Sequence, residues 1–339
     1  MRFAVYLPLI APLLAAIAAP RLAERLPPRI ATWLLTGSAL ALAAASSAVL
    51  GLLALAAAVR IPLVDVVAGL SLNVMSAHDP ASLPLGAAAG ALLVAAAAAV
   101  LRAGWRRADA LIAAHRQAHR LPGARDGGRV IVVTDDAADA YSVPGWPGRI
   151  VVTSGMMRAL SATERRVLLA HEQAHSSGRH YLFTAAVRLA SAANPLLRPL
   201  SAAVGYSVER WADEQAADAT GDRPLAARTI AKAALAASAT PSGTPRSDST
   251  APCRRPVPAG ALGVVTSQPG RRGAGVVPRR VAALLRPAPR LRLLPLAAVL
   301  TLVMISGLSA LQAARGFHGL LEFAQTPTSS ATASAATAP

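Results

Sequence analysis

The pentapeptide His171-Glu172-Gln173-Ala174-His175 is the most informative stretch of this chain. It has the pattern H-E-x-x-H, in which a glutamate directly follows the first of two histidines. Residues i and i+4 lie on one face of a helix, so both imidazoles can reach one metal ion. Glu172 then lies at the edge of that face, close enough to take a proton from a water on the metal. This arrangement is typical of zinc-dependent peptide hydrolysis.

The flanking sequence predicts that the pentapeptide is helical. Ser161-Ala162-Thr163-Glu164 has the form of a capping box, in which the serine caps the first amides and the glutamate reaches back. The apolar run Val167–Ala170 leads into the first histidine, and Gly178 is a suitable end. We therefore expect a helix from near Thr163 to Gly178, with both histidines in its last turns.

A catalytic zinc ion needs a third protein ligand and an open position. The alanine-rich segment ERWADEQAAD, which begins at Glu209, is helical in character and places Glu209 and Asp213 on one face. Glu209 can supply the third ligand. Asp213 can accept the outer N–H of a ligand histidine, and His171 is the best candidate. Glu214 and Asp218 form a second pair with the same spacing and are the rival candidates.

Together the two motifs resemble those of the gluzincin-type membrane metallopeptidases. H-E-x-x-H is followed by E-x-x-A-D at Glu209–Asp213, and Ala140–Gly145 with Gly148–Gly155 resembles the strand that these proteins carry before the zinc helix. Two related families share the pattern: the BlaR/MecR antirepressor proteases of beta-lactam signalling, and the HtpX/Ste-type membrane proteases. The resemblance extends over about residues 129–220. The BlaR/MecR pattern often has an aspartate five residues after the second histidine, whereas this chain has His180 there.

The composition indicates a membrane protein. The mean hydropathy is +0.44 and 54% of the 339 residues are hydrophobic, which is too apolar for an ordinary soluble chain. Four segments are long enough to cross a bilayer, namely residues 3–19, 30–59, 83–101 and 293–314. The first could instead be a signal peptide, but Arg2 is its only basic residue before the apolar run, and Pro8 and Pro12 interrupt it. These features favour a retained span.

The placement of arginine predicts the orientation in the membrane. Arginines cluster between the first two spans, after the third and before the fourth. By the positive-inside rule these stretches face the cytoplasm, so both termini are expected outside the cell and residues 102–292 inside it. Juxtamembrane arginines beside anionic lipid then account for the net charge of +17. No recognition motif for nucleic acid accompanies this charge, so no nucleic-acid partner is expected.

The expected fold is therefore mainly α: a polytopic membrane protein with four transmembrane helices and a small α+β, zincin-like cytoplasmic metallopeptidase domain. The expected divisions are three spans in 1–101, the peptidase domain in 102–238, a disordered Pro/Gly/Ser/Arg-rich linker in 239–280, a juxtamembrane helix and the fourth span in 281–314, and an extracytoplasmic tail in 315–339.

Two Val/Ile-rich stretches in the peptidase domain, 129–134 and 149–153, are predicted to be strands with a turn between them at Pro144–Gly148. In zincin-like sites a strand edge beside the metal pairs with an extended substrate. By this analogy the substrate edge is assigned to Ile150, Val151, Val152, Thr153 and Ser154. Residues 181–208 are expected to form a helical pair, broken at Asn194-Pro195, that packs on the zinc helix or dips into the membrane surface.

The remaining candidate residues give weaker signals. The oxyanion of peptide hydrolysis needs a donor besides zinc, and the sequence does not choose among Tyr206, His180 and Tyr181. His115-Arg116-Gln117-Ala118-His119 repeats the histidine spacing without the glutamate and lies among arginines, which is typical of a solvated basic face. Cys253 is the only cysteine, which excludes an intrachain disulfide and a cysteine-based metal site.

The resemblance implies a membrane-anchored zinc metalloendopeptidase with one catalytic Zn²⁺ and a protein substrate. As in the BlaR/MecR relatives, the substrate is expected to be a cytoplasmic transcription repressor. The alternative is a quality-control protease that degrades damaged membrane proteins, as in the HtpX/Ste-type relatives. A non-catalytic zinc-binding receptor or scaffold is a third reading, but structural zinc sites are usually closed by cysteine. The sequence does not indicate an oligomeric state.

Overall fold

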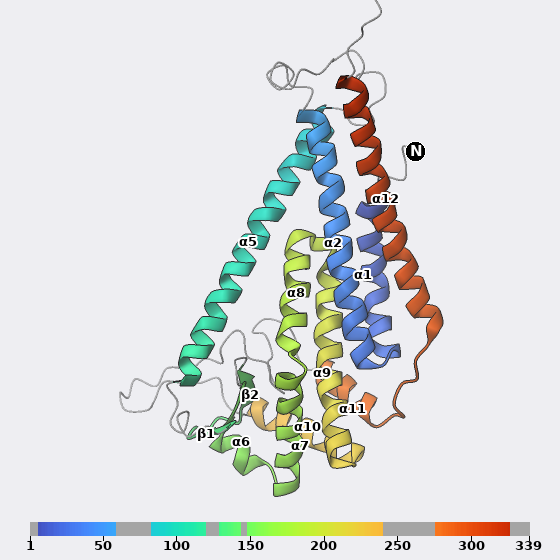
Figure 1. The fold of residues 1–339 in the computed structure, drawn as a ribbon. Coiled ribbons are helices and arrows are strands. Elements are labelled where there is room, and N and C mark those ends of the chain that lie inside the picture. Colours follow the sequence, from blue (N-terminus) through green and yellow to red (C-terminus); the bar gives the residue numbers. More distant parts are fainter. Residues whose placement is uncertain (1–5, 59–82, 120–128, 144–147, 240–274, 326–339) are drawn as a thin grey trace, which may run out of the picture.

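The computed structural model describes residues 6–58, 83–119, 129–143, 148–239 and 275–325 (Figure 1). Long helices fill one end of the molecule, and the strands and shorter helices gather at the other. Most of the predicted linker, residues 240–274, lies outside the described residues, as does the end of the predicted tail.

Four of the described helices are long and apolar enough to cross a membrane: α1 (Leu7–Arg25), α2 (Pro28–Ala58), α5 (Leu83–His119) and α12 (Leu293–Gln325). The prediction of a mainly α, polytopic fold is confirmed. Two of the helices are longer than the predicted spans. α5 continues past Leu101 through the arginine-rich stretch. Similarly, α12 continues into the segment predicted to be a tail.

Helices α2 and α5 meet near the C-terminal end of α2. Gly86 and Gly90, one turn apart on α5, face α2 there. A Cβ atom on Gly86 would lie 2.1 Å from the Cβ atom of Ala57 and 2.8 Å from the carbonyl oxygen of Leu53, so only glycine fits. Small residues four positions apart commonly allow such close approach between membrane helices. Below this contact α5 leans away from α2 (Figure 1).

The sheet has three strands, β1 (Val130–Val133), β2 (Ala140–Val143) and β3 (Arg149–Thr153), in the order β1-β3-β2. β1 and β3 are parallel, whereas β2 and β3 are antiparallel. Both predicted strands are present, and most of the predicted turn, residues 144–147, lies outside the described residues. Parallel strands need a longer connection, and here β2 lies between them in the chain.

The position of β3 also corrects the expected substrate edge. β3 is the central strand, and its main chain pairs with β1 on one side and with β2 on the other. Residues Ile150–Thr153 therefore do not form an open edge. Ser154 begins the short helix α6 (Ser154–Ala159), and the Thr153 hydroxyl caps that helix by accepting a hydrogen bond from Met156 N at 3.2 Å.

The helix with the H-E-x-x-H motif, α7 (Ala162–Ser177), begins and ends where predicted. Its capping box is formed: Ser161 Oγ accepts from Glu164 N at 3.4 Å, and the Glu164 carboxylate accepts from Ser161 N at 2.7 Å. Leu168 packs on a cluster from the sheet and α6, and Val167 packs on a second cluster from the helices that follow. The helix is thus fixed between two apolar layers.

The remaining described elements are α8 (His180–Ala193), the 3₁₀ turn η2 (Pro195–Leu197), α9 (Arg198–Thr220), α10 (Arg223–Ala239) and α11 (Val276–Leu284). α11 begins five residues before the predicted juxtamembrane helix at Val281. The last part of the predicted linker is therefore helical. The α11 residues Val277, Val281 and Leu284 pack on α7, α9 and α10.

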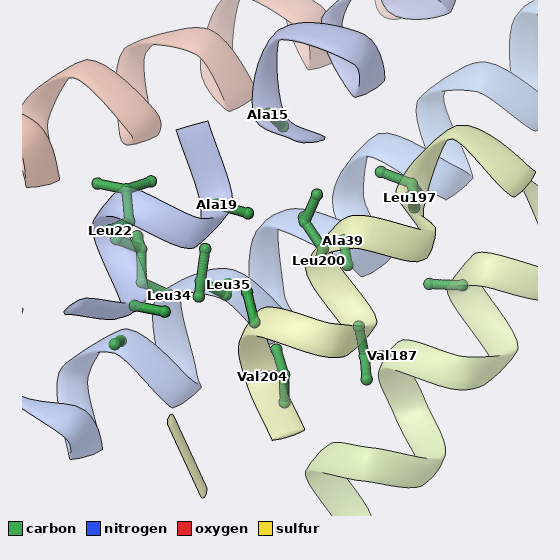
Figure 2. Close-up of a cluster of buried hydrophobic side chains, with 14 of the residues drawn as sticks. Ala15, Ala19, Leu22, Leu34, Leu35, Ala39, Val187, Leu197, Leu200 and Val204 are labelled. Atoms are coloured by element: carbon green, nitrogen blue, oxygen red, sulfur yellow. The ribbon is translucent and has the colours of Figure 1, made fainter. Parts of the chain in front are cut away.

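Helices α8 and α9 form a hairpin that runs alongside the candidate spans (Figure 1). Figure 2 shows Val187, Leu197, Leu200 and Val204 of this hairpin among the side chains of α1 and α2. At its turn the Asn194 amide donates to the Ser46 hydroxyl of α2 at 3.2 Å. Ser46 lies about 27 Å along α2 from its start, at 1.5 Å per residue. The hairpin therefore packs along the spans as well as on α7.

Candidate active site

Both histidines of the motif lie in the last turns of α7 and are buried, at 0% and 1% exposure. Their Nε2 atoms face each other at 3.1 Å. Glu209 of α9 completes a triangle, with one carboxylate oxygen 3.7 Å from His171 Nε2 and the other 3.5 Å from His175 Nε2. The three donors predicted from the sequence are thus brought together and form a possible metal site.

The spacing of these donors fits a zinc ion. Tetrahedral zinc with ligand bonds of about 2.0–2.1 Å requires donor atoms about 3.3 Å apart. The two imidazole nitrogens are 3.1 Å apart, close to that value, and they lie 3.5 and 3.7 Å from different oxygens of the Glu209 carboxylate. Two neutral imidazoles and one carboxylate are also a donor set of catalytic zinc sites, which keep a fourth position open.

The rival acidic pair is directed elsewhere. Glu214 forms an ion pair and two hydrogen bonds with Arg223 of α10, one of them at 3.1 Å. Asp218 is exposed at the surface of α9. Glu209 and Asp213, and not Glu214 and Asp218, therefore lie beside the two histidines.

Asp213 lies behind His171. Its Oδ1 atom is 3.0 Å from His171 Nδ1, the nitrogen that points away from the other donors. A proton held at Nδ1 leaves Nε2 free to bind a metal. Burial alone would raise the pKa of Asp213. The charge and hydrogen bonds of Arg280 outweigh burial and, with His171, lower the pKa to about 2. Asp213 is therefore a carboxylate at neutral pH.

Arg280 of α11 is a site residue that sequence reasoning missed. It is 2% exposed and donates to both carboxylate oxygens of Asp213, at 2.8 and 2.6 Å. Its Nη1 also lies 3.0 Å from Glu209 Oε2. The sequence places Arg280 among the basic residues before the last span. Val277, Val281 and Leu284 have the spacing of one apolar helix face, and Arg280 lies on that same face. This spacing was the signal in the sequence that Arg280 could be buried.

His180 lies behind the second ligand. Its Nδ1 is 2.9 Å from His175 Nδ1, so it contacts the nitrogen opposite the metal-facing Nε2. Burial lowers the pKa of His180 to about 3 and holds that of His175 well below its usual range, with smaller contributions from neighbouring positive charge. Both rings are therefore neutral, and one Nδ1 donates to the other. His180 occupies the position at which the BlaR/MecR pattern often has an aspartate.

The turn between α7 and α8 makes this contact possible. A Cβ atom on Gly178 would lie 2.4 Å from His180 Nε2, so a larger residue would displace the ring. Arg179 follows with φ 48°, a left-handed conformation that separates the end of α7 from the start of α8. The ring of His180 then packs on Trp211 of α9, with 4.6 Å between centroids.

The two tyrosines that were predicted as oxyanion donors lie on different helices, Tyr206 on α9 and Tyr181 on α8. Tyr206 precedes Glu209 by one turn of α9, and Arg279 lies 4.7 Å from the centre of its ring. Burial raises the pKa of Tyr206, against the opposing charges of nearby arginines. Tyr181 is half-buried at the start of α8, where its carbonyl oxygen accepts a hydrogen bond from Thr184.

The donors lie directly beside the turn between the first two spans. Arg210, the residue after Glu209, is buried and donates to the carbonyl oxygens of Ala23 and Glu24 at 2.7 and 3.3 Å. The Glu24 side chain pairs with Arg279 of α11. The metal donors are therefore tied to the end of α1.

Comparison with known proteins adds one finding. No curated protein and no solved structure matches the chain. Residues 101–207 match the model of peptidase family M48. The matched segment contains α7 with its H-E-x-x-H motif and ends two residues before Glu209. The family match does not distinguish the BlaR/MecR type from other members. The match supports a membrane metallopeptidase that is similar to family M48.

Proposed function

We propose that this chain is a membrane-anchored zinc metalloendopeptidase. The observation that carries the proposal is the convergence of His171, His175 and Glu209 on one point, with Glu172 buried beside them. The family match over residues 101–207 agrees with it.

Each residue has a role that follows from its position. His171, His175 and Glu209 would hold Zn²⁺, which supplies an acidified water and a Lewis acid for the substrate carbonyl when it is bound. Glu172 accepts a proton from the attacking water and passes it to the leaving amine. His180 contacts the outer nitrogen of His175, so we assign it an orienting role. Tyr206, on the same helix as Glu209, is then the best placed oxyanion donor of the three candidates.

Replacement of the proposed base tests the mechanism. Glu172→Gln should lower cleavage of casein by about 10²- to 10⁴-fold, because a general base is lost. Zinc content should not change, because Glu172 is not a ligand. Glu214→Gln is the matched control, since Glu214 pairs with Arg223 away from the metal donors. If purified Glu172→Gln protein cleaves as fast as the wild type, the mechanism is wrong. Zinc binding without any cleavage by the wild type would favour a scaffold.

For the physiological role we propose regulated cleavage of a cytoplasmic transcription repressor, as the BlaR/MecR resemblance implies. Cells with Glu172→Gln should accumulate one uncleaved repressor. Failure of any repressor to accumulate in a proteome comparison would contradict this role.

One observation favours a second candidate, the degradation of membrane proteins. The donors are joined to the end of α1 through Arg210, and the α8–α9 hairpin packs along the spans. This position suits segments that leave the bilayer. In that case many membrane proteins, rather than one repressor, should accumulate in Glu172→Gln cells.

A further inference from the structure

Two adjoining hollows lie between α1 and α12, at the ends of these helices nearest the metal donors. The outer hollow has a volume of about 560 Å³ and is lined by both helix ends. The inner hollow, of about 420 Å³, continues between α1, α2, α9 and α12. Both are lined by Ala18, Leu22 and Pro295, so the two hollows adjoin, and we call them together the α1–α12 groove.

The groove has the depth of one lipid leaflet. It extends from Arg292, the residue before α12, to Val303 of that helix. At 1.5 Å per residue this distance is about 16 Å. The hydrocarbon core of a bilayer is about 30 Å thick, so the groove covers about half of it.

The outer end of the groove carries concentrated positive charge. Arg21, Arg25 and Arg292 line it together, and all three are exposed. Among the described residues no acidic group forms an ion pair with them, and the adjacent Glu24 pairs with Arg279 instead. Arginine side chains favour phosphate because their planar fork of donors matches its oxygens.

The inner end of the groove is apolar. Its lining consists of alanine, leucine, valine and proline side chains, with Ser38 the one hydroxyl among them. Figure 2 shows three of these residues, Leu22, Leu35 and Leu200, where α1, α2 and α9 pack together. Such a lining accepts hydrocarbon and offers nothing to a free inorganic anion.

We propose that the α1–α12 groove binds one anionic phospholipid. Its phosphate lies among Arg21, Arg25 and Arg292, and an acyl chain fills the inner hollow. The ligand must be both anionic and apolar because the groove is basic at one end and apolar along its length. A bound lipid joins α12, which follows the Arg280 helix in the chain, to the first span.

Native mass spectrometry of the full chain released from detergent tests the proposal. Dioleoyl phosphatidylglycerol should remain bound at least tenfold more than dioleoyl phosphatidylcholine. The combined variant Arg21→Ala, Arg25→Ala, Arg292→Ala should lose this preference. The matched control is Arg102→Ala, Arg106→Ala, Arg116→Ala, which removes three exposed arginines from α5. Ala18→Phe, which fills the groove without a change of charge, should lower retention of both lipids.

Several outcomes would overturn the proposal. Equal loss of phosphatidylglycerol in the two triple variants would mean that general surface charge holds the lipid. Full competition by glycerol phosphate at equal concentration would mean that the apolar groove contributes nothing. Equal retention of the two lipids would mean that the arginines do not select the headgroup. A dimer in place of a lipid adduct would mean that a second copy of the chain covers the groove. Thermal unfolding of each variant in the same detergent verifies that it is folded.

Discussion

At the residue scale, neighbouring side chains hold the three candidate metal ligands in place. Asp213 lies behind His171 at 3.0 Å, and His180 lies behind His175 at 2.9 Å. Arg280 joins Asp213 to Glu209. Each donor therefore has a buried partner that limits its rotation, and such partners raise metal affinity by pre-organising the ligands.

Arg280 provides the sharpest test at this scale. Arg280→Ala leaves Asp213 buried without its counter-charge, so it should lower the free energy of unfolding by about 3–5 kcal/mol. Arg280→Lys should recover only part of the loss, because lysine cannot make the two-pronged contact. Thermal and denaturant unfolding of the purified chain measures both.

The neighbouring arginine is the control for that prediction. Arg279 is 48% exposed and pairs with the half-exposed Glu24. An exposed pair contributes about 0–1 kcal/mol, so Arg279→Ala should have little effect. Equal losses in Arg279→Ala and Arg280→Ala would show that the buried contact with Asp213 does not stabilise the fold.

The candidate ligands could be selected from the sequence because their spacing is local. His171 and His175, and likewise Glu209 and Asp213, lie one helical turn apart, and a helix alone puts each pair on one face. The role of Arg280 was not predictable, because it depends on the contact of α11 with Asp213, which lies 67 residues earlier in the chain. The role of His180 depends on the left-handed turn at Arg179, which no preference of arginine indicates.

At the element scale, the apolar helices were predictable because length and hydropathy are properties of a single segment. The strand order was not, because it depends on pairing between segments. The Val/Ile-rich stretches predicted β1 and β3, but Ala140–Val143 has too mixed a composition to indicate that β2 would lie beside β3. The substrate edge was misplaced for this reason.

Gly86 allows a test of the close packing between α2 and α5. Gly86→Ala should destabilise the chain by about 1–3 kcal/mol, because its Cβ atom would overlap Ala57. Gly90→Ala is the matched control one turn away, where a Cβ atom would lie 3.5 Å from Ala54, an ordinary contact. Unfolding of both variants in the same detergent gives the comparison. If both are equally stable, the close packing of α2 on α5 is wrong.

At the scale of the whole molecule, the active-site elements lie at one end of the four candidate spans (Figure 1). An even number of spans puts the two chain ends on the same side of a membrane. The residues between α5 and α12 then share the side of the α1–α2 turn, to which Arg210 ties the metal donors. The arginines of these stretches predict that this side is the cytoplasm.

Cys253 allows the orientation to be measured, because it is the only cysteine and lies between α10 and α11 in the sequence. A membrane-impermeant maleimide should label it in inside-out vesicles and leave it unlabelled in right-side-out vesicles. The opposite result is expected for Ser76→Cys in a Cys253→Ser chain, because residue 76 follows α2 and precedes α5. Labelling after detergent treatment verifies that each thiol can react. Labelling of both positions from the same side would rule out four spans, and the reversed pattern would place the peptidase outside the cytoplasm.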